Sequence, residues 1–400
     1  LVPSKQGYTF DPVEAEVAIV AANETQDFIG TDANAAPPPP SLPNANFKGA
    51  GWLRFLDDLE SGLSSVDYSE NGVGWNLEYW HNVEDLASSL VELRDTERVY
   101  TIIRLDKKLP SHDVLPLDQY SNCQHPEMIK WMTSDEGLDH QYKKVVDNPI
   151  IKEASKDDNP VTPIFILNNE PNHIDPVSGR HDEGFPLTAV QYANLYNCYY
   201  QHWRVEKNYP HYLFVAGPGQ WGPVYDPDVP GSGFSSGWRT FLPEMFATGV
   251  LDGADGFAMH VYGYYQEAGC TPSPGNECGD PEGTTLFKPW TDLIMDSVTG
   301  NSTTKNKPII ITEYNPGVNP NEDTKPPPLI EGIDTWQNWF DRTYCWMYYG
   351  NWPQMRGALY FVDDEDHNRD QFWDSDWWES SLDNHEDRRQ HWLEAPTGFG

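Results

Sequence analysis

The sequence predicts an α/β protein, a (β/α)8 barrel of the TIM type, from two features of its second half. Short, almost wholly apolar segments recur there, each starting 44 to 53 residues after the one before, and helix-like segments lie between them. Strands that are apolar on both faces belong to a parallel sheet covered by helices. This repeat length suits a decorated barrel, and the alternative is a doubly wound open sheet. The expected strands are Ile164–Leu167, Tyr212–Ala216, Gly256–Met259, Ile309–Thr312 and Ala358–Val362, and the expected helices are Leu187–Val205, Trp238–Thr248, Phe287–Val298 and Ile333–Tyr349.

The first half is less regular. Val99–Arg104 is a third expected strand, preceded by a helix over Val83–Arg94, while Val17–Ala21 and Gly51–Phe55 are earlier candidate strands. The polyproline run Ala35–Pro40 is incompatible with a helix. We therefore expect an irregular, Pro-rich N-terminal region over about residues 1–50.

A long polar insert follows the third strand, over Asp106–Asn159, with one helix-like piece over Met128–Val146. Inserts of this length in a compact domain are usually functional. No linker or clear internal repeat divides the chain. The sequence thus predicts a single domain over residues 1–400.

The charge balance narrows the range of partners. There are 62 acidic and 26 basic residues, which gives a net charge of -36 and a pI near 4.4. Such a surface repels nucleic acid and anionic membranes, and no apolar run reaches the length of a membrane span. The acidic excess indicates an extracellular, secreted protein or one adapted to salt. The chain starts at Leu1, which fits a removed leader or a truncation, and Asn23 and Asn301 fit the glycosylation acceptor pattern.

The five cysteines are an odd number. Cys270 and Cys278 bracket a Pro/Gly-rich loop and are a candidate disulfide, which sequence spacing alone does not decide. Cys123, Cys198 and Cys345 are scattered. No zinc spacing, phosphate-binding loop or nucleophile elbow is present, so no metal or other cofactor is expected.

Carboxylates follow two of the apolar strands at the point where each strand ends. Asn169 and Glu170 come directly after Ile164–Leu167, and Glu313 comes directly after Ile309–Thr312. In a barrel, the carboxyl ends of the strands carry the active site, so these two acids can face each other across the barrel mouth. Facing carboxylates, one protonated and one ionised, are what glycoside hydrolysis requires.

The segments Asn169-Glu170-Pro171, His260-Val261-Tyr262 and Thr312-Glu313 at successive strand ends resemble the retaining (β/α)8 glycoside hydrolases of clan A. The resemblance covers about residues 160 to 365. It implies that Glu170 is the acid/base and Glu313 the nucleophile. It further implies that Asn169 binds the sugar 2-hydroxyl and that His260 and Tyr262 support the nucleophile.

Other assignments to the site are less direct. The clan often carries an Arg near the nucleophile, and Arg104 or Arg54 would fill that place; we assign Arg104, with an ion pair to Asp106 as its alternative role. Trp221 is assigned to sugar binding because aromatic faces stack on sugar rings. Further candidates for the cleft are Trp75, Trp80, Trp131 and Trp238, and the clan's Trp after strand eight would be replaced by Tyr360, Phe361 or Trp373. The acidic residues Asp363–Asp366 are a candidate Ca²⁺ site, with a solvated loop as the alternative.

The expected function is hydrolysis of O-glycosidic bonds in a poly- or oligosaccharide with retention of configuration. A non-catalytic carbohydrate-binding or structural barrel is one alternative, and an inverting hydrolase or a transglycosylase on the same fold is another. The sugar, the linkage, endo or exo action and the oligomeric state are left open by the sequence.

Overall fold

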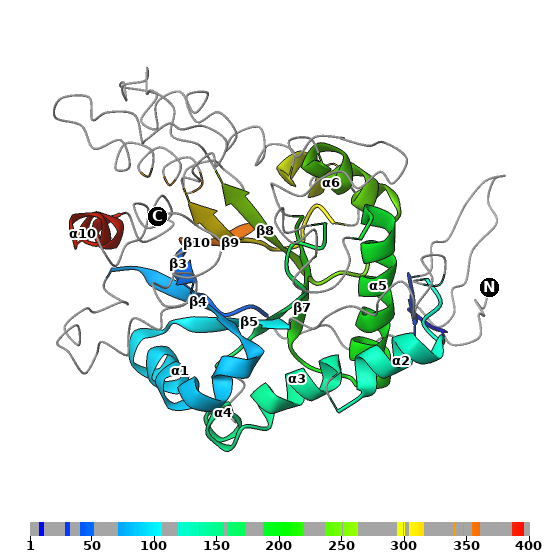
Figure 1. Ribbon diagram of the computed structural model, residues 1–400, viewed down its shortest axis with the longest axis horizontal. Coiled ribbons are helices and arrows are strands. Elements are labelled where there is room, and N and C mark those ends of the chain that lie inside the picture. The colour runs from blue at the N-terminus through cyan, green and yellow to red at the C-terminus, as the bar shows by residue number, and fades with distance from the viewer. Residues whose placement is uncertain are drawn as a thin grey trace, which may run out of the picture.

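The computed structural model has a closed barrel of parallel strands at its centre, which confirms the predicted fold class (Figure 1). The strands follow one another round the barrel in the order β10-β3-β4-β5-β6-β7-β8-β9. The structure describes residues 8–11, 29–32, 41–51, 71–105, 119, 121–135, 137–155, 159–172, 187–218, 237–249, 251–262, 294–298, 300, 304–315, 340, 344, 347, 354–360 and 386–395.

Four of the five strands expected in the second half lie at their predicted positions, and the fifth is shifted by a few residues. The first barrel strands, however, were largely missed by the sequence analysis. The barrel strands are β3 (Lys48–Gly51), β4 (Val73–Tyr79), β5 (Tyr100–Leu105), β6 (Ile164–Leu167), β7 (Tyr212–Ala216), β8 (Gly256–Tyr262), β9 (Ile309–Asn315) and β10 (Met355–Tyr360). A separate antiparallel pair, β1 (Tyr8–Asp11) with β2 (Ile29–Asp32), lies in the region expected to be irregular.

Strands β3 and β4 escaped prediction because their sequences, KGAG and VGWNLEY, are neither continuously apolar nor cleanly alternating. Glycine is needed in β3 because a Cβ on Gly49 would lie 2.6 Å from the carbonyl oxygen of Trp75. A Cβ on Gly357 in β10 would likewise lie 2.6 Å from the Trp75 ring. The Trp75 side chain is buried and its Nε1 donates to the carbonyl of Arg356 at 3.1 Å. Trp75 is therefore part of the barrel core rather than a cleft residue.

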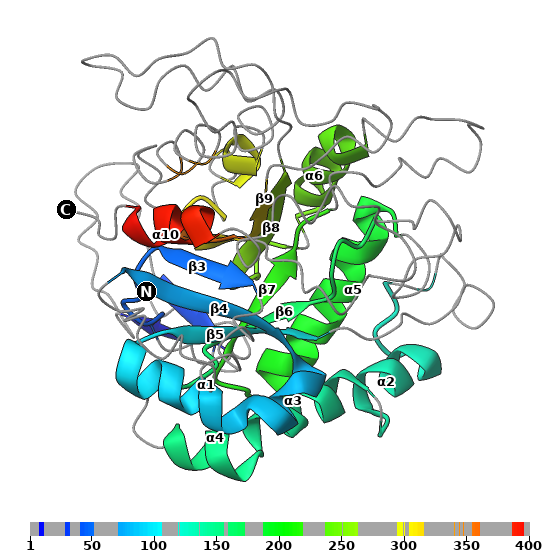
Figure 2. The same ribbon diagram turned by 60° about the vertical axis from the view of Figure 1, so that its left-hand side comes forward.

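The helices lie outside the barrel, as the two views in Figures 1 and 2 show. They are α1 (Val83–Glu97), α2 (Pro126–Thr133), α3 (Leu138–Val146), α4 (Pro149–Ala154), α5 (Ala189–Gln201), α6 (Gly237–Ala247) and α10 (Glu386–Glu394), with short turns η2 (Trp80–Asn82) and η4 (His202–Glu206). Local signals fix several ends: Thr188 and Gln191 form a capping box at the start of α5, and Asn148 caps α4 just before Pro149.

The insert after β5 contains three helices in its described part, where the sequence had suggested a single helix-like piece. The chain leaves α2 at Ser134 and begins α3 after Gly137, so the predicted helix over 128–146 is interrupted. A disulfide between Cys123 and Cys198 links this insert to α5. The sequence did not predict this pairing, and Cys270 and Cys278 lie outside the described residues.

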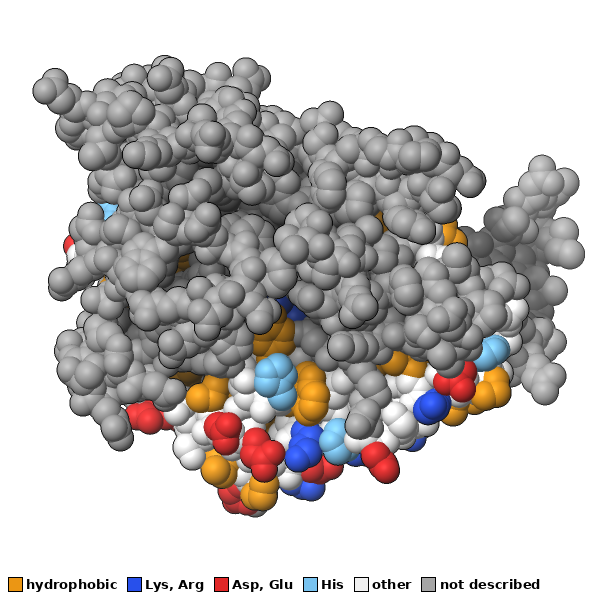
Figure 3. All heavy atoms as spheres, in the orientation of Figure 1, with side chains coloured by type: hydrophobic (Ala, Val, Ile, Leu, Met, Phe, Trp, Pro, Cys, Tyr) orange, Lys and Arg blue, Asp and Glu red, His pale blue; other side chains and the backbone are white. Residues whose placement is uncertain are grey.

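The described surface over α1, α3 and α4 mixes acidic with basic side chains (Figure 3). Lys144 lies 3.4 Å from Glu84, and Lys152 lies 2.9 Å from Asp147. Among the described residues, no helix combines the length and the apolar character needed to cross a bilayer.

Candidate active site

Glu170 follows β6 on a turn with unusual backbone geometry. The φ angles of Asn168 and Glu170 are 66° and 36°, in the left-handed region that residues other than glycine seldom adopt. The backbone N–H of Asn168 donates to the carbonyl of Leu105 at 3.1 Å, which keeps the turn attached to β5. The buried side-chain amide of Asn168 has no hydrogen-bond partner. Strained backbone and an unsatisfied amide both cost stability, and such costs concentrate at functional sites.

Glu313 lies in β9 and pairs with an arginine from the third barrel strand. Arg104 Nη2 donates to Glu313 Oε1 at 2.5 Å, and both side chains are buried. This contact places Arg104 beside the candidate nucleophile, as the sequence predicts, while Asp106, its alternative partner, lies outside the described residues. A buried carboxylate needs such a partner because desolvation penalises its charge. Arg104 therefore holds Glu313 as part of the candidate site.

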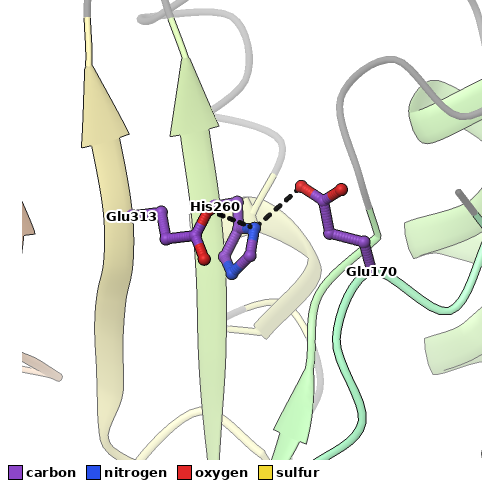
Figure 4. A group of neighbouring side chains, drawn as sticks. All are labelled: Glu170, His260 and Glu313. Carbon is purple, nitrogen blue, oxygen red and sulfur yellow. Dashed lines mark hydrogen bonds and ion pairs between the residues drawn. The ribbon is translucent and has the colours of Figure 1, made fainter. Parts of the chain in front are cut away.

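His260 lies in β8, between the two carboxylates (Figure 4). Its Nδ1 is 2.8 Å from Glu170 Oε1 and 3.2 Å from Glu313 Oε2, and its Nε2 is 3.3 Å from Arg104 Nη2. A guanidinium only donates hydrogen bonds, so Nε2 must accept and the ring proton belongs on Nδ1. The arrangement thus assigns one His260 N–H to both carboxylates.

The two acids lie close together and both are buried. One carboxylate oxygen of Glu170, one of Glu313 and a nitrogen of His260 all lie within 4.8 Å of one another. Glu170 is 9% exposed and Glu313 4% exposed. Two carboxyl groups this close to each other can take the separate roles of proton donor and nucleophile in one reaction.

The same three side chains are a chemically reasonable donor set for a metal ion, since one imidazole nitrogen and two carboxylate oxygens would suit a divalent transition metal. Arg104 works against this, because its guanidinium already neutralises the Glu313 carboxylate at 2.5 Å. The charge arrangement therefore favours use of the two acids without a metal.

The remaining predicted residues fall into two groups. Asn169 lies between Asn168 and Glu170 and is half-buried, and Tyr262 is the last residue of β8. Trp221, Arg54, Phe361, Trp373 and the acidic stretch 363–366 lie outside the described residues, as does the side chain of Trp238.

Tyr360 is not a sugar platform, because it is fully buried with its ring 5.4 Å from that of Tyr314. Burial also raises the pKa of the Tyr314 phenol, which keeps this neighbour of Glu313 neutral. Trp131 is buried as well, with its ring 6.3 Å from that of Tyr199, so it packs against α5 rather than lining a cleft.

Sequence reasoning missed Tyr79, the last residue of β4. Arg104 Nη1 donates to its hydroxyl at 3.1 Å, which joins Tyr79 to the cluster. The sequence of β4, VGWNLEY, does not predict a strand, so nothing in it marks Tyr79 as a strand-end residue. The usable signal was the position of the Tyr79-Trp80-His81 segment directly before a predicted helix.

Comparisons with known proteins find likeness only among solved structures. No protein-family model matches the chain, and no curated protein matches it in sequence. An endo-β-1,3-glucanase from Sorangium cellulosum is 12% identical with a TM-score of 0.42, over 88% of this chain and 100% of that one. An endo-β-1,4-mannanase from Thermotoga petrophila is 12% identical with a TM-score of 0.40, over 81% of this chain and 70% of that one. Similarity of this degree does not by itself assign an activity.

Proposed function

We propose that the protein is a retaining glycoside hydrolase that cleaves O-glycosidic bonds of a poly- or oligosaccharide. The observation that carries this proposal is the convergence of Glu170 and Glu313, with oxygens within 4.8 Å, at the carboxyl ends of the barrel strands. Two carboxyl groups about 5–5.5 Å apart are typical of retaining enzymes, whereas inverting enzymes separate them by about 6.5–9.5 Å to admit a water molecule. Nearest oxygens within 4.8 Å of each other are compatible with the shorter separation, on which the proposal of retention is based.

In the proposed mechanism, Glu313 attacks the anomeric carbon while Glu170 donates its proton to the departing glycosidic oxygen. This gives a covalent glycosyl-enzyme and releases the first sugar fragment. Glu170, now ionised, takes a proton from water, whose oxygen attacks the anomeric carbon and displaces Glu313. The two displacements together retain the anomeric configuration, and both acids return to their starting protonation states.

The surrounding side chains support these steps. Arg104 neutralises the resting charge of Glu313, and the His260 N–H lies within reach of both acids, so both residues limit the repulsion between the carboxylates. Asn169 is proposed to bind the sugar 2-hydroxyl, and Tyr262 and Trp221 to contact the substrate. We also propose that the protein is secreted, which its acidic composition supports.

A panel of glycans, including β-1,3-glucan and β-1,4-mannan, tests the function when incubated with the full chain at low and at high salt. We expect release of reducing sugar from at least one glycan. Proton NMR at early times should show product with the configuration of the substrate. EDTA should leave the rate unchanged, since no step uses a metal.

Each alternative gives a different result. Product of opposite configuration would indicate an inverting enzyme, and new glycosidic products in place of free sugar would indicate a transglycosylase. Binding of glycans without any hydrolysis would indicate a carbohydrate-binding barrel. If EDTA abolishes activity and added Zn²⁺ restores it, the Glu170–His260–Glu313 cluster binds a metal ion and the proposed mechanism is wrong.

A further inference from the structure

We infer that Tyr79 is a positioning residue, which orients the Arg104 guanidinium so that it holds Glu313 in the geometry for attack. The inference rests on the proposed function, because it assigns Tyr79 a part in the same reaction. Tyr79 acts through Arg104, whose guanidinium its hydroxyl and ring both contact.

The fold places the two residues side by side. Strands β4 and β5 are parallel neighbours in the barrel, and their register pairs Tyr79 with Arg104 at the carboxyl ends of both strands. Paired residues in neighbouring strands project to the same face of a sheet. The contact therefore follows from the barrel itself and does not depend on a loop.

Tyr79 holds the guanidinium in two ways. Its hydroxyl accepts a hydrogen bond from Arg104 Nη1 at 3.1 Å, and the central guanidinium carbon lies 5.2 Å from the centre of its ring. The hydrogen bond constrains the group within its plane, and the ring contact adds a cation–π attraction. The Tyr79 ring in turn stacks on His81, with centroids 5.4 Å apart and planes 20° apart.

The rigid shape of the guanidinium transmits this constraint. Its donors lie in one fixed plane, so fixing Nη1 also fixes the direction of Nη2. Arg104 Nη2 is the atom that donates to Glu313 Oε1 and faces His260 Nε2. Without the Tyr79 hydroxyl, the guanidinium can rotate, and the carboxylate must be reoriented in each catalytic cycle. Preorganised charges accelerate a reaction because this reorganisation is avoided.

The test compares Tyr79→Phe, which keeps the ring and removes the acceptor, with Tyr79→Leu, which removes both. Tyr100→Phe is the matched control, since Tyr100 begins β5 at the opposite end of the barrel. For each variant, kcat, KM and the pre-steady-state release of an activated aryl leaving group are measured on a substrate identified by the panel. We expect Tyr79→Phe to lower kcat and the release rate about tenfold to hundredfold, with KM changed by less than about twofold. Tyr79→Leu should lower both rates further.

The Tyr100→Phe control should keep wild-type rates, and Tyr79→Phe should keep the wild-type melting temperature. Wild-type kcat in Tyr79→Phe overturns this inference alone, as does a loss of rate matched by the Tyr100→Phe control. A loss that falls on KM with kcat preserved would assign Tyr79 to substrate binding and also overturn the positioning role. A wild-type chain that hydrolyses no glycan overturns the proposed function, and this inference with it.

Discussion

Two buried arginine–carboxylate pairs lie at opposite ends of the barrel, and their surroundings differ. Arg104 and Glu313 meet at the carboxyl ends of β5 and β9. Arg204 and Asp255 meet at the amino end of β8, since Asp255 directly precedes that strand. All four side chains are at most 5% exposed. The chemistry of the two pairs is alike, so their different roles must come from their other neighbours.

At the amino end, the Asp255 carboxylate accepts hydrogen bonds from several parts of the fold. Besides Arg204, Asp255 accepts from the Tyr200 hydroxyl and from the backbone N–H of Leu213, each at 2.9 Å. At the carboxyl end, Glu313 shares its surroundings with a second acid, Glu170, through His260. A carboxylate saturated by donors stabilises the structure, whereas one beside another acid is available for chemistry. Lys48 reinforces this view of the amino end, because its buried ammonium donates to the carbonyls of Trp392, Leu393 and Ala395 at the end of α10.

The sharpest test of this contrast is Glu313→Gln. We expect kcat to fall by about a thousandfold or more, because an amide is a poor nucleophile and carries no charge. The free energy of unfolding should change by less than about 1 kcal/mol, since the neighbouring Glu170 can then give up its proton and supply the negative charge that offsets Arg104. Kinetics and urea unfolding measure the two effects. Glu92→Gln on exposed α1 is the matched control, and near wild-type turnover in Glu313→Gln refutes the assignment of the nucleophile.

Glu170→Gln tests the other acid. Hydrolysis of a natural glycan should fall by about a hundredfold or more, because the leaving oxygen no longer receives a proton. With a good aryl leaving group, formation of the glycosyl-enzyme should be affected much less, since that step needs little protonation. The measurement is kcat/KM of Glu170→Gln relative to the wild type, on the natural glycan and on the substrate with the aryl leaving group. Equal losses on both would remove Glu170 from the acid role.

Asp255→Asn probes the amino end and should show the opposite pattern. Removing the charge leaves Arg204 buried without a compensating anion, so the free energy of unfolding should fall by about 3 kcal/mol. The folded fraction should keep the wild-type kcat, because Asp255 precedes β8 at the amino end of the barrel, whereas Glu313 lies towards the carboxyl end of β9. Urea unfolding monitored by tryptophan fluorescence measures this, with Asp296→Asn as an exposed control. A loss of kcat without a loss of stability would contradict the proposed division of roles.

The smallest expected effect concerns His202, a second histidine between two acids. Its Nε2 lies 2.9 Å from Asp139 and its Nδ1 2.6 Å from Glu206. Burial opposes the charged form, but the two hydrogen bonds outweigh it and the pKa of His202 is raised above 6.5. The stabilisation is therefore fully present below pH 6.5 and is lost as pH rises through the raised pKa.

The His202→Gln substitution should remove this pH-dependent part of the free energy of unfolding. The difference in unfolding free energy between the wild type and the variant should shrink by less than about 1 kcal/mol as pH rises above 6.5, because Glu206 is partly exposed to solvent. Urea unfolding at a series of pH values measures it. A difference that grows with rising pH would show that the neutral, not the charged, imidazole is the stabilising form.

The sequence predicts the strands that are continuously apolar. It does not predict those whose residues are chosen by contacts with other strands of the barrel. Strand β6, with the sequence IFIL, is recognisable without any tertiary information. Strand β3 is not, because its Gly49 is required by the nearness of Trp75. The acids Glu170 and Glu313 were found through their strand-end positions. Tyr79 was missed with its strand, and the Cys123–Cys198 pairing depends on how the insert packs on α5.

The order of apolar strands and of the residues that follow them was enough to determine a parallel barrel and the two acids at its carboxyl end. The physical reason is that each buried strand requires a run of apolar residues, and these runs recur at regular intervals in the sequence. Only the tertiary structure decided which ring nitrogen of His260 carries the proton and which residue orients the Arg104 guanidinium. These depend on distances of 2.5 to 3.3 Å between side chains from different strands. Closure of the barrel sets such distances, and no local pattern in the sequence encodes them.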